Sequence, residues 1–297
     1  MSAPSNPSAS TPFTTLISVE QLQALQASGA PLRVFDCSFE LMNPEAADRL
    51  FAQGHIAGAV QAHLDRHLSA QSAEDAVNGG RHPLPRRETF AVWLRDAGFD
   101  SNMQAVVYDR NGANYCGRLW WMLKWAGHEA VAVLDGGLQA WEAAGGAVEA
   151  GVPDATPSLG NFTLSPEKTT LTHTDTVAKN LGRPAQTVVD ARATPRFRGE
   201  VEPLDPVAGH IPGALNRPFG ANLGVDGRFK PADTLKAEFE ALLAGRDPAT
   251  VVHHCGSGVS AVPNVLAMEV AGLGRTALYA GSWSEWCRTP GLPVERG

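Results

Sequence analysis

The sequence predicts an α/β protein that contains two copies of one domain, each with a parallel sheet flanked by helices. Two observations lead to this prediction: short apolar runs alternate with helix-like stretches, and four segments occur twice in the same order. Strands that alternate with helical patterns are typical of parallel sheets covered by helices. The 297 residues, of which 43% are hydrophobic, are enough for two ordinary domains with cores of their own.

The internal repeat divides the chain into parts. Its matched segments are 34–40 with 188–194, 54–60 with 209–215, 106–112 with 251–257, and 134–145 with 279–290. Because the order is kept and the offset changes little, a duplicated domain explains the matches better than chance. The expected parts are a disordered Ser/Pro-rich tail over 1–12, a first domain over 13–145, a linker over 146–168 and a second domain over 169–297.

Each copy is expected to run through the same elements. A short β-branched run ends at an acidic residue, Asp36 in the first copy and Asp190 in the second. A Gly-His-Ile turn, a helical stretch and a second apolar strand follow, and a long helix and a last short strand complete the copy. Each turn has its own histidine, His55 in the first copy and His210 in the second. Because both copies have it, we expect this histidine to have a structural role.

Composition and charge exclude several classes of protein. The net charge is −7 and no block of Lys or Arg stands out, so no nucleic-acid partner is expected. Apolar stretches are interrupted before the roughly 18 residues that a membrane span needs, and the first dozen residues do not resemble a signal peptide. The four cysteines form no CxxC pair and no Cys/His spacing. This pattern indicates free thiols in a reducing cytoplasm, without disulfides or a metal site.

One cysteine lies where the two copies differ in chemistry. Cys255 follows an apolar strand, and the first copy has Arg110 at the matching position. The small residues within 256–260 form a loop that leads into a helix and turns several backbone N–H groups toward one point. Such a loop favours negative charge, and therefore the nucleophilic thiolate form of cysteine. We predict that the second copy carries the chemistry and the first supports it.

Two chemistries use a cysteine in such a loop. A cysteine phosphatase needs an arginine six residues after the nucleophile, and this chain has Ala261 there. In sulfur transfer, the thiolate attacks a sulfur donor, becomes a persulfide and passes the outer sulfur to cyanide or a thiol, while loop amides stabilise the anion. The residues favour sulfur transfer, which requires no metal and no organic cofactor.

Three motifs resemble a known family. CGSGVSA (255–261) is similar to the active loop of 3-mercaptopyruvate sulfurtransferases, AGSWSEW (280–286) resembles a C-terminal signature of rhodanese-type proteins, and GHIPGAL (209–215) resembles their domain signature. Beyond its first dozen residues the chain resembles a two-domain rhodanese-type sulfurtransferase, with the catalytic cysteine in the second of two tandem rhodanese-like domains. Thiosulfate enzymes typically have basic residues where this loop has Gly256 and Ser257, so 3-mercaptopyruvate is the favoured donor.

The resemblance also implies site residues around Cys255. Arg196 matches an arginine that contacts the anionic donor, and Asp65 and His82 match first-domain residues that form a proton relay with Ser257. A histidine with its ordinary pKa of about 6.5 would suit proton transfer to the pyruvate enolate. The implied donor-binding residues of the loop are Gly256, Gly258, Val259 and Ser260.

One departure from the family pattern bears on the donor. Mercaptopyruvate enzymes usually carry a second, carboxylate-binding arginine in an E-P-R stretch, and the matching VEPLDP stretch has Leu204. Unless Arg81, Arg198 or Arg228 substitutes for that arginine, the affinity for mercaptopyruvate should be lower by roughly tenfold or more. The alternatives are a thiosulfate:cyanide sulfurtransferase of the same fold, or a sulfur-relay or binding module. The expected acceptors are cyanide, a thiol or a thioredoxin-like reductant.

Overall fold

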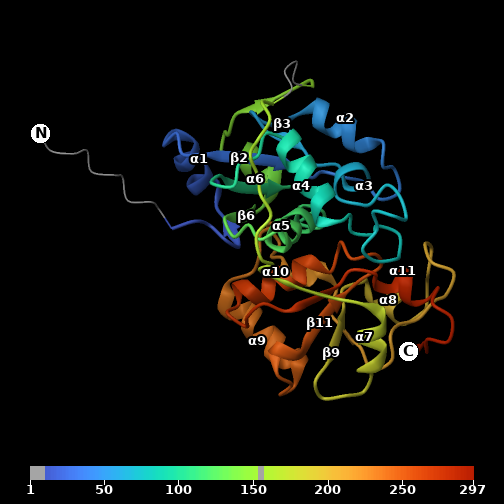
Figure 1. Cartoon of the computed structure of the whole chain (residues 1–297). Helices are drawn as coiled ribbons and strands as arrows, with labels where there is room; N and C mark the ends of the chain where they lie inside the picture. The colour runs from blue at the N-terminus through green and yellow to red at the C-terminus, as the bar shows by residue number, and fades with distance from the viewer. Residues whose placement is uncertain (1–10, 153–156) are drawn as a thin grey trace, which may run out of the picture.

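The computed structural model describes residues 11–152 and 157–297, which form two domains (Figure 1). In the first domain the strand order is β1-β6-β5-β2-β4, and all neighbouring strands are parallel. The strands are β1 (Leu16–Ile17), β2 (Leu32–Asp36), β4 (Val60–Gln61), β5 (Gln104–Tyr108) and β6 (Val131–Leu134). Almost all of the expected tail, residues 1–10, lies outside the described residues.

The second domain repeats this sheet. Its order is β8-β12-β11-β9-β10, again with parallel neighbours only. The strands are β8 (Thr170–Thr172), β9 (Thr187–Asp190), β10 (Leu215–Asn216), β11 (Val251–His254) and β12 (Ala277–Tyr279). The central strand β5 corresponds to β11, and both precede a buried helix. The predicted α/β class and the duplication are therefore confirmed.

Helices cover both sheets. The first domain has α1 (Val19–Ala27), α2 (Ala46–Gln53), α3 (Leu64–His67), α4 (Arg87–Asp96), α5 (Cys116–Trp125) and α6 (Gly137–Ala143). The second has α7 (Thr174–Lys179), α8 (Thr194–Phe197), α9 (Ala232–Leu243), α10 (Val262–Val270) and α11 (Ser282–Trp286), with 3-10 turns at Phe219–Asn222 and Pro248–Thr250. No helix of the described part is long and apolar enough to cross a membrane.

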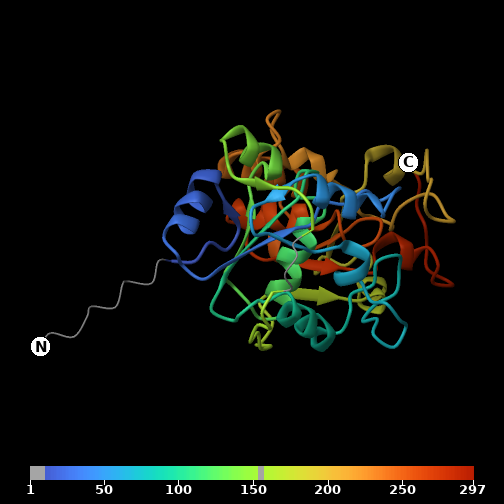
Figure 2. The ribbon, with the colours of Figure 1, turned by 90° about the horizontal axis from the view of Figure 1, so that it is seen from above.

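The helices that follow the two central strands pack against each other between the domains. Every residue of α5 is buried, and α5 lies beside α10 at the centre of the molecule (Figure 1). A Cβ added to Gly117 would stand 3.4 Å from Val262, so the glycine lets the two helices approach closely. Seen from above, the first domain covers much of the second (Figure 2). One hydrophobic core thus runs through both domains and includes Trp121 and Leu266.

The repeated Gly-His-Ile turns have the same packing role in both copies. His55 Nδ1 is 2.9 Å from the carbonyl oxygen of Phe51, and its ring stacks on Phe51 with centroids 3.9 Å apart. His210 Nδ1 is 2.8 Å from the carbonyl oxygen of Phe197, and its ring stacks on Phe197 at 3.8 Å. These contacts agree with the structural role that we expected because both copies have a histidine at this position.

Part of the segment expected to link the domains is folded against the first domain. The short strand β7 (Val148–Glu149) pairs antiparallel with β3 (His55–Ile56). Farther along, Phe162 is buried and its ring lies 5.7 Å from that of Phe99. Residues 153–156 of the same segment lie outside the described residues.

Candidate active site

Cys255 lies at the carboxyl end of β11, and its side chain is buried between the domains. Its N–H donates to Ser282 Oγ (3.1 Å), and its carbonyl oxygen accepts from the N–H of Trp283 (3.0 Å). The carbonyl oxygen of Gly256 accepts from the N–H of Ser284 (2.9 Å). The AGSWSEW segment, which includes α11, therefore fixes the beginning of the cysteine loop.

The matching loop of the first domain wraps around a negative charge from its own chain. The carboxylate of Asp109 accepts hydrogen bonds from four backbone N–H groups, at 2.8–3.1 Å, those of Asn111, Ala113, Tyr115 and Cys116. Arg110, which matches Cys255, instead turns to Asp36, with 3.6 Å between Nη1 and Oδ2. A loop of this shape binds an anion with several amides at once.

The cysteine loop lacks such an internal carboxylate. His254 stands at the position of Asp109, and its Nε2 lies 3.5 Å from Oδ2 of Asp190. Among the described residues, no acceptor is bonded to the backbone N–H groups of 256–261. An anionic sulfur on Cys255 could accept hydrogen bonds from these N–H groups. Backbone N–H groups stabilise thiolates and oxyanions in the same way.

Gly258 holds the loop against the neighbouring strand connection. Its φ is +74°, and an added Cβ would stand 2.3 Å from the carbonyl oxygen of Ala280. A side chain would therefore be strained by the backbone angle and would also collide. Val259, the next residue, is buried in the core that both domains share, and Ser260 is half-buried.

The structure brings together the three residues expected to form a relay. Nδ1 of His82 is 2.8 Å from Oγ of Ser257, and Nε2 of His82 is 3.5 Å from Oδ1 of Asp65. The carboxylate beside Nε2 favours the tautomer with its proton there, so Nδ1 accepts the hydroxyl proton of Ser257. The relay joins helix α3 and the loop that carries His82, both of the first domain, to the cysteine loop of the second.

The ordinary pKa expected for His82 is wrong. Burial, with the charges of Arg118 and Arg81 adding to it, lowers the pKa of His82 to about 3. An imidazolium in this enclosed position would be poorly solvated and would face two cations. His82 is therefore neutral at pH 7, and the ordinary value of about 6.5 does not apply.

Arg118 is a site neighbour that the sequence analysis missed. Its fully buried guanidinium donates to three carbonyl oxygens, those of Leu68 (3.2 Å), His82 (2.9 Å) and Gly258 (3.0 Å). Burial lowers its pKa to about 10, an effect that a negative charge on Cys255 would oppose. The available signal was a single arginine inside the apolar helix segment CGRLWWMLKW, where a charge needs partners to be buried.

Arg196 lies beside the cysteine loop, where the resemblance placed it. Its Nη2 donates to Oε1 of Glu202 at 2.6 Å, and its Nε to Oε2 of Glu202 at 3.3 Å. Glu202 is almost fully buried and also lies 3.3 Å from Nη1 of Arg192. The carboxylate therefore holds Arg196 in one orientation with its Nη1 toward Gly256, 3.5 Å from where a Cβ on Gly256 would stand.

The other cysteines are not part of this arrangement. Cys37 and Cys116 are buried in the first domain, where burial raises the pKa of both thiols well above the ordinary value. Cys287 is partly exposed, and burial also raises its pKa. All four cysteines of the chain are free thiols.

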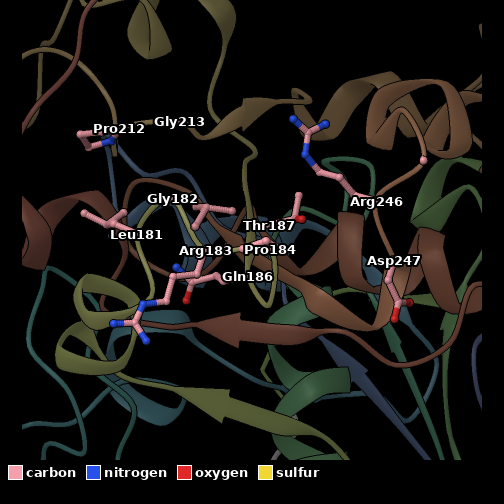
Figure 3. Close-up of a pocket in the computed structure, with 12 residues that line it drawn as sticks. Leu181, Gly182, Arg183, Pro184, Gln186, Thr187, Pro212, Gly213, Arg246 and Asp247 are labelled. Carbon is pink, nitrogen blue, oxygen red and sulfur yellow. The ribbon is translucent and has the colours of Figure 1, made fainter.

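A hollow of about 500 Å³ elsewhere on the second domain carries no comparable chemistry (Figure 3). It lies at the amino end of β9, next to Thr187, and so at the opposite edge of the sheet from Cys255. Its two arginines, Arg183 and Arg246, point in different directions (Figure 3). Within 11–152 and 157–297, no group of three or more His, Cys, Asp or Glu residues is arranged to hold a metal ion.

A cysteine at the carboxyl end of a parallel strand, in a loop of open backbone N–H groups, defines a protein built for thiolate chemistry on small anions. Comparison with known families agrees with this class. The rhodanese-like domain family matches residues 18–144 and 173–289. The chain belongs to the rhodanese family, with two tandem domains.

Individual relatives cover nearly the whole chain. A Pseudomonas aeruginosa protein named as a probable 3-mercaptopyruvate sulfurtransferase is 45% identical over 283 residues, covering 95% of this chain and 98% of the relative. A Mycobacterium tuberculosis protein named as a putative thiosulfate sulfurtransferase is 40% identical over 291 residues, covering 95% of this chain and 97% of the relative. The crystal structure of the 3-mercaptopyruvate enzyme of Escherichia coli superposes with a TM-score of 0.75 at 30% identity, covering 92% of this chain and 100% of that one.

Proposed function

We propose that this chain is a sulfurtransferase that moves a sulfane sulfur from 3-mercaptopyruvate to a thiophilic acceptor through a persulfide on Cys255. The observation that carries the proposal is the contrast between the two matching loops. One is filled by the carboxylate of Asp109, and the other leaves its N–H groups open around Cys255. Relatives named for 3-mercaptopyruvate, at 45% and 36% identity, favour this donor.

In the first half-reaction the Cys255 thiolate attacks the sulfur of the donor. The carbon–sulfur bond breaks, and its electron pair remains on the leaving pyruvate as an enolate. The open N–H groups of the loop stabilise the negative charge of the persulfide by hydrogen bonds. In the second half-reaction cyanide or a thiolate attacks the outer sulfur, and the Cys255 thiolate is released. No metal or organic cofactor enters either step.

The relay of Asp65, His82 and Ser257 supplies the proton movement. The donor thiol loses a proton as its sulfur joins Cys255, and the enolate gains one at carbon. Ser257 can accept the first proton while its own passes to Nδ1 of His82, and the transfer then reverses toward the enolate. Because His82 is neutral at rest, its lone pair is available for this shuttle.

Thiosulfate is the second candidate donor, because several relatives are named for it and Leu204 supplies no positive charge. After thiosulfate gives up its outer sulfur, sulfite is the leaving group, and no carbon atom needs a proton. The two donors are distinguished by measuring sulfur transfer to cyanide with each, at matched concentrations of wild type and Cys255→Ser. Cys287→Ser is the matched control, since Cys287 is the partly exposed cysteine outside the loop.

Faster turnover with 3-mercaptopyruvate, lost in Cys255→Ser and kept in Cys287→Ser, is the expected result. Faster turnover with thiosulfate would overturn the choice of donor. Activity of Cys255→Ser equal to wild type would overturn the persulfide itself. The proposal includes a thiol or a thioredoxin-like reductant as acceptor in a reducing, cytoplasmic setting, in keeping with four free cysteines.

A further inference from the structure

A second arginine reaches the cysteine loop from the first domain. Arg81 directly precedes His82, and its backbone N–H donates to Oγ of Ser284 at 3.0 Å. Its Nη1 donates to Oδ1 of Asp205 at 2.9 Å, and its side chain is about a quarter exposed. Both contacts cross between domains, so the position of Arg81 depends on how the domains pack.

Two guanidinium groups converge on Gly256, the residue after Cys255. A Cβ added to Gly256 would stand 3.1 Å from Nη2 of Arg81 and 3.5 Å from Nη1 of Arg196. Gly256 does not have a positive φ, so its backbone angle does not require glycine. The absence of a side chain instead leaves room for both arginines beside the nucleophile.

Buried carboxylates orient this pair. Asp205, whose side chain is fully buried, lies 2.9 Å from Nη1 of Arg81 and 3.5 Å from Nη2 of Arg196. Glu202 occupies Nε and Nη2 of Arg196. Two of the remaining nitrogens, Nη2 of Arg81 and Nη1 of Arg196, face Gly256 and have no hydrogen-bond acceptor among the described residues. Two donors from two domains are thus left for one small anion.

The other arginines considered for this role lie elsewhere. Arg198 is more than half exposed and is paired with Glu200 at 3.7 Å. The side chain of Arg228 lies against Gly136 of the first domain. Leu204 provides only its backbone N–H, which donates to Oε1 of Glu202 at 3.1 Å.

We propose that Arg81 and Arg196 together bind the carboxylate of the α-keto acid donor, so that Arg81 substitutes for the arginine that is absent at position 204. This inference rests on the proposed function. The donor carries its sulfur two carbon atoms from the carboxylate carbon. A carboxylate held over Gly256 therefore places the sulfur toward the adjacent Cys255, about 3.8 Å away along the backbone. Two charged donors on two carboxylate oxygens also give a defined orientation.

The test compares Arg81→Met, Arg81→Lys and Arg288→Met with wild type. Arg288 is the matched control, because it also lies near Asp205 (3.4 Å) but does not approach Gly256. The KM for 3-mercaptopyruvate should rise by about tenfold to a hundredfold in Arg81→Met, the loss expected for one charge-assisted hydrogen bond. The kcat should change by less than about threefold, Arg81→Lys should recover part of the loss, and Arg288→Met should match wild type.

A second measurement does not depend on turnover. Pyruvate is titrated into the Cys255→Ser protein with and without Arg81→Met, and its Kd should rise by a similar factor. An unchanged KM and an unchanged pyruvate Kd in Arg81→Met would overturn the role of Arg81 while leaving the proposed function standing. An equal rise in KM for thiosulfate would overturn carboxylate recognition in favour of a general anion site. Absence of wild-type turnover with 3-mercaptopyruvate would instead count against the proposed function.

Discussion

Arg118→Lys tests whether the first domain holds the catalytic loop of the second in place. The guanidinium has no exposed surface and binds three backbone carbonyl oxygens that come from both domains, those of Leu68, His82 and Gly258. Lysine keeps the positive charge but carries its donors on a single nitrogen. It cannot reproduce the planar fork that reaches three separate acceptors.

The size of the effect follows from these contacts. Lysine can keep about one of the three bonds, so two charge-assisted hydrogen bonds are lost, at about 1.5–3 kcal/mol each. The free energy of unfolding should fall by about 3–6 kcal/mol, which is a large part of the roughly 5–15 kcal/mol typical of a native protein. The kcat should also fall by more than about tenfold, because the carbonyl groups of Gly258 and His82 belong to the loop and the relay.

The assay combines urea unfolding, followed by tryptophan fluorescence, with sulfur transfer to cyanide. Arg95→Lys is the control, since Arg95 is half-buried and donates one bond of 3.1 Å to the carbonyl oxygen of Phe162, far from the loop. The control should lose no more than about 1 kcal/mol. If Arg118→Lys unfolds within about 1 kcal/mol of wild type and keeps its kcat, Arg118 does not hold the loop and the reasoning is refuted.

Two further predictions concern the relay and acid stability. Ser257→Ala and His82→Gln should each lower kcat for 3-mercaptopyruvate about a hundredfold and leave thiosulfate turnover within about threefold. The ratio of the wild-type kcat to the His82→Gln kcat should not depend on protonation of His82 near neutral pH. A ratio that falls as the pH is lowered, with a midpoint near pH 6.5, would contradict a neutral His82. Burial lowers the pKa of both His82 and His253 to about 3, so the unfolded chain binds their protons first as pH falls from 7. Each of these histidines should therefore lower the free energy of unfolding by about 2 kcal/mol between pH 7 and pH 5. Urea unfolding at both pH values checks this: His82→Gln should lose about 2 kcal/mol less than wild type, and an equal loss would contradict it.

Much of the fold could be predicted from local pattern. The strands that end at Asp36 and Asp190 are the corresponding strands β2 and β9 of the two sheets. The expected second strand and long helix of each copy are β5 with α5, and β11 with α10. Alternation of apolar strands with helices is encoded over a few residues at a time, and the duplicated domain shows the same alternation a second time.

The candidate site was predictable only where a motif marks it. Cys255, Ser257 and Gly258 belong to one continuous loop, so their proximity follows from the chain itself. His82 and Asp65 were identified through resemblance, but the buried and neutral state of the His82 ring was not, because protonation depends on what surrounds the ring. The ordinary pKa assumed for His82 failed for this physical reason: burial and two neighbouring cations were not visible in its flanking residues.

By itself the sequence determined the duplicated α/β domains, the nucleophile at a strand end and the chemistry that its loop favours. The packing of α5 on α10 decided the rest. It brings Arg118 to Gly258, 140 residues away, and Arg81 to Asp205, 124 residues away. Such contacts depend on the shape of two complementary faces and on the burial of charges between them, which no local pattern encodes. Leu204 illustrates the difference, because the sequence reports only a missing arginine, whereas the tertiary structure places Arg81 beside the same loop.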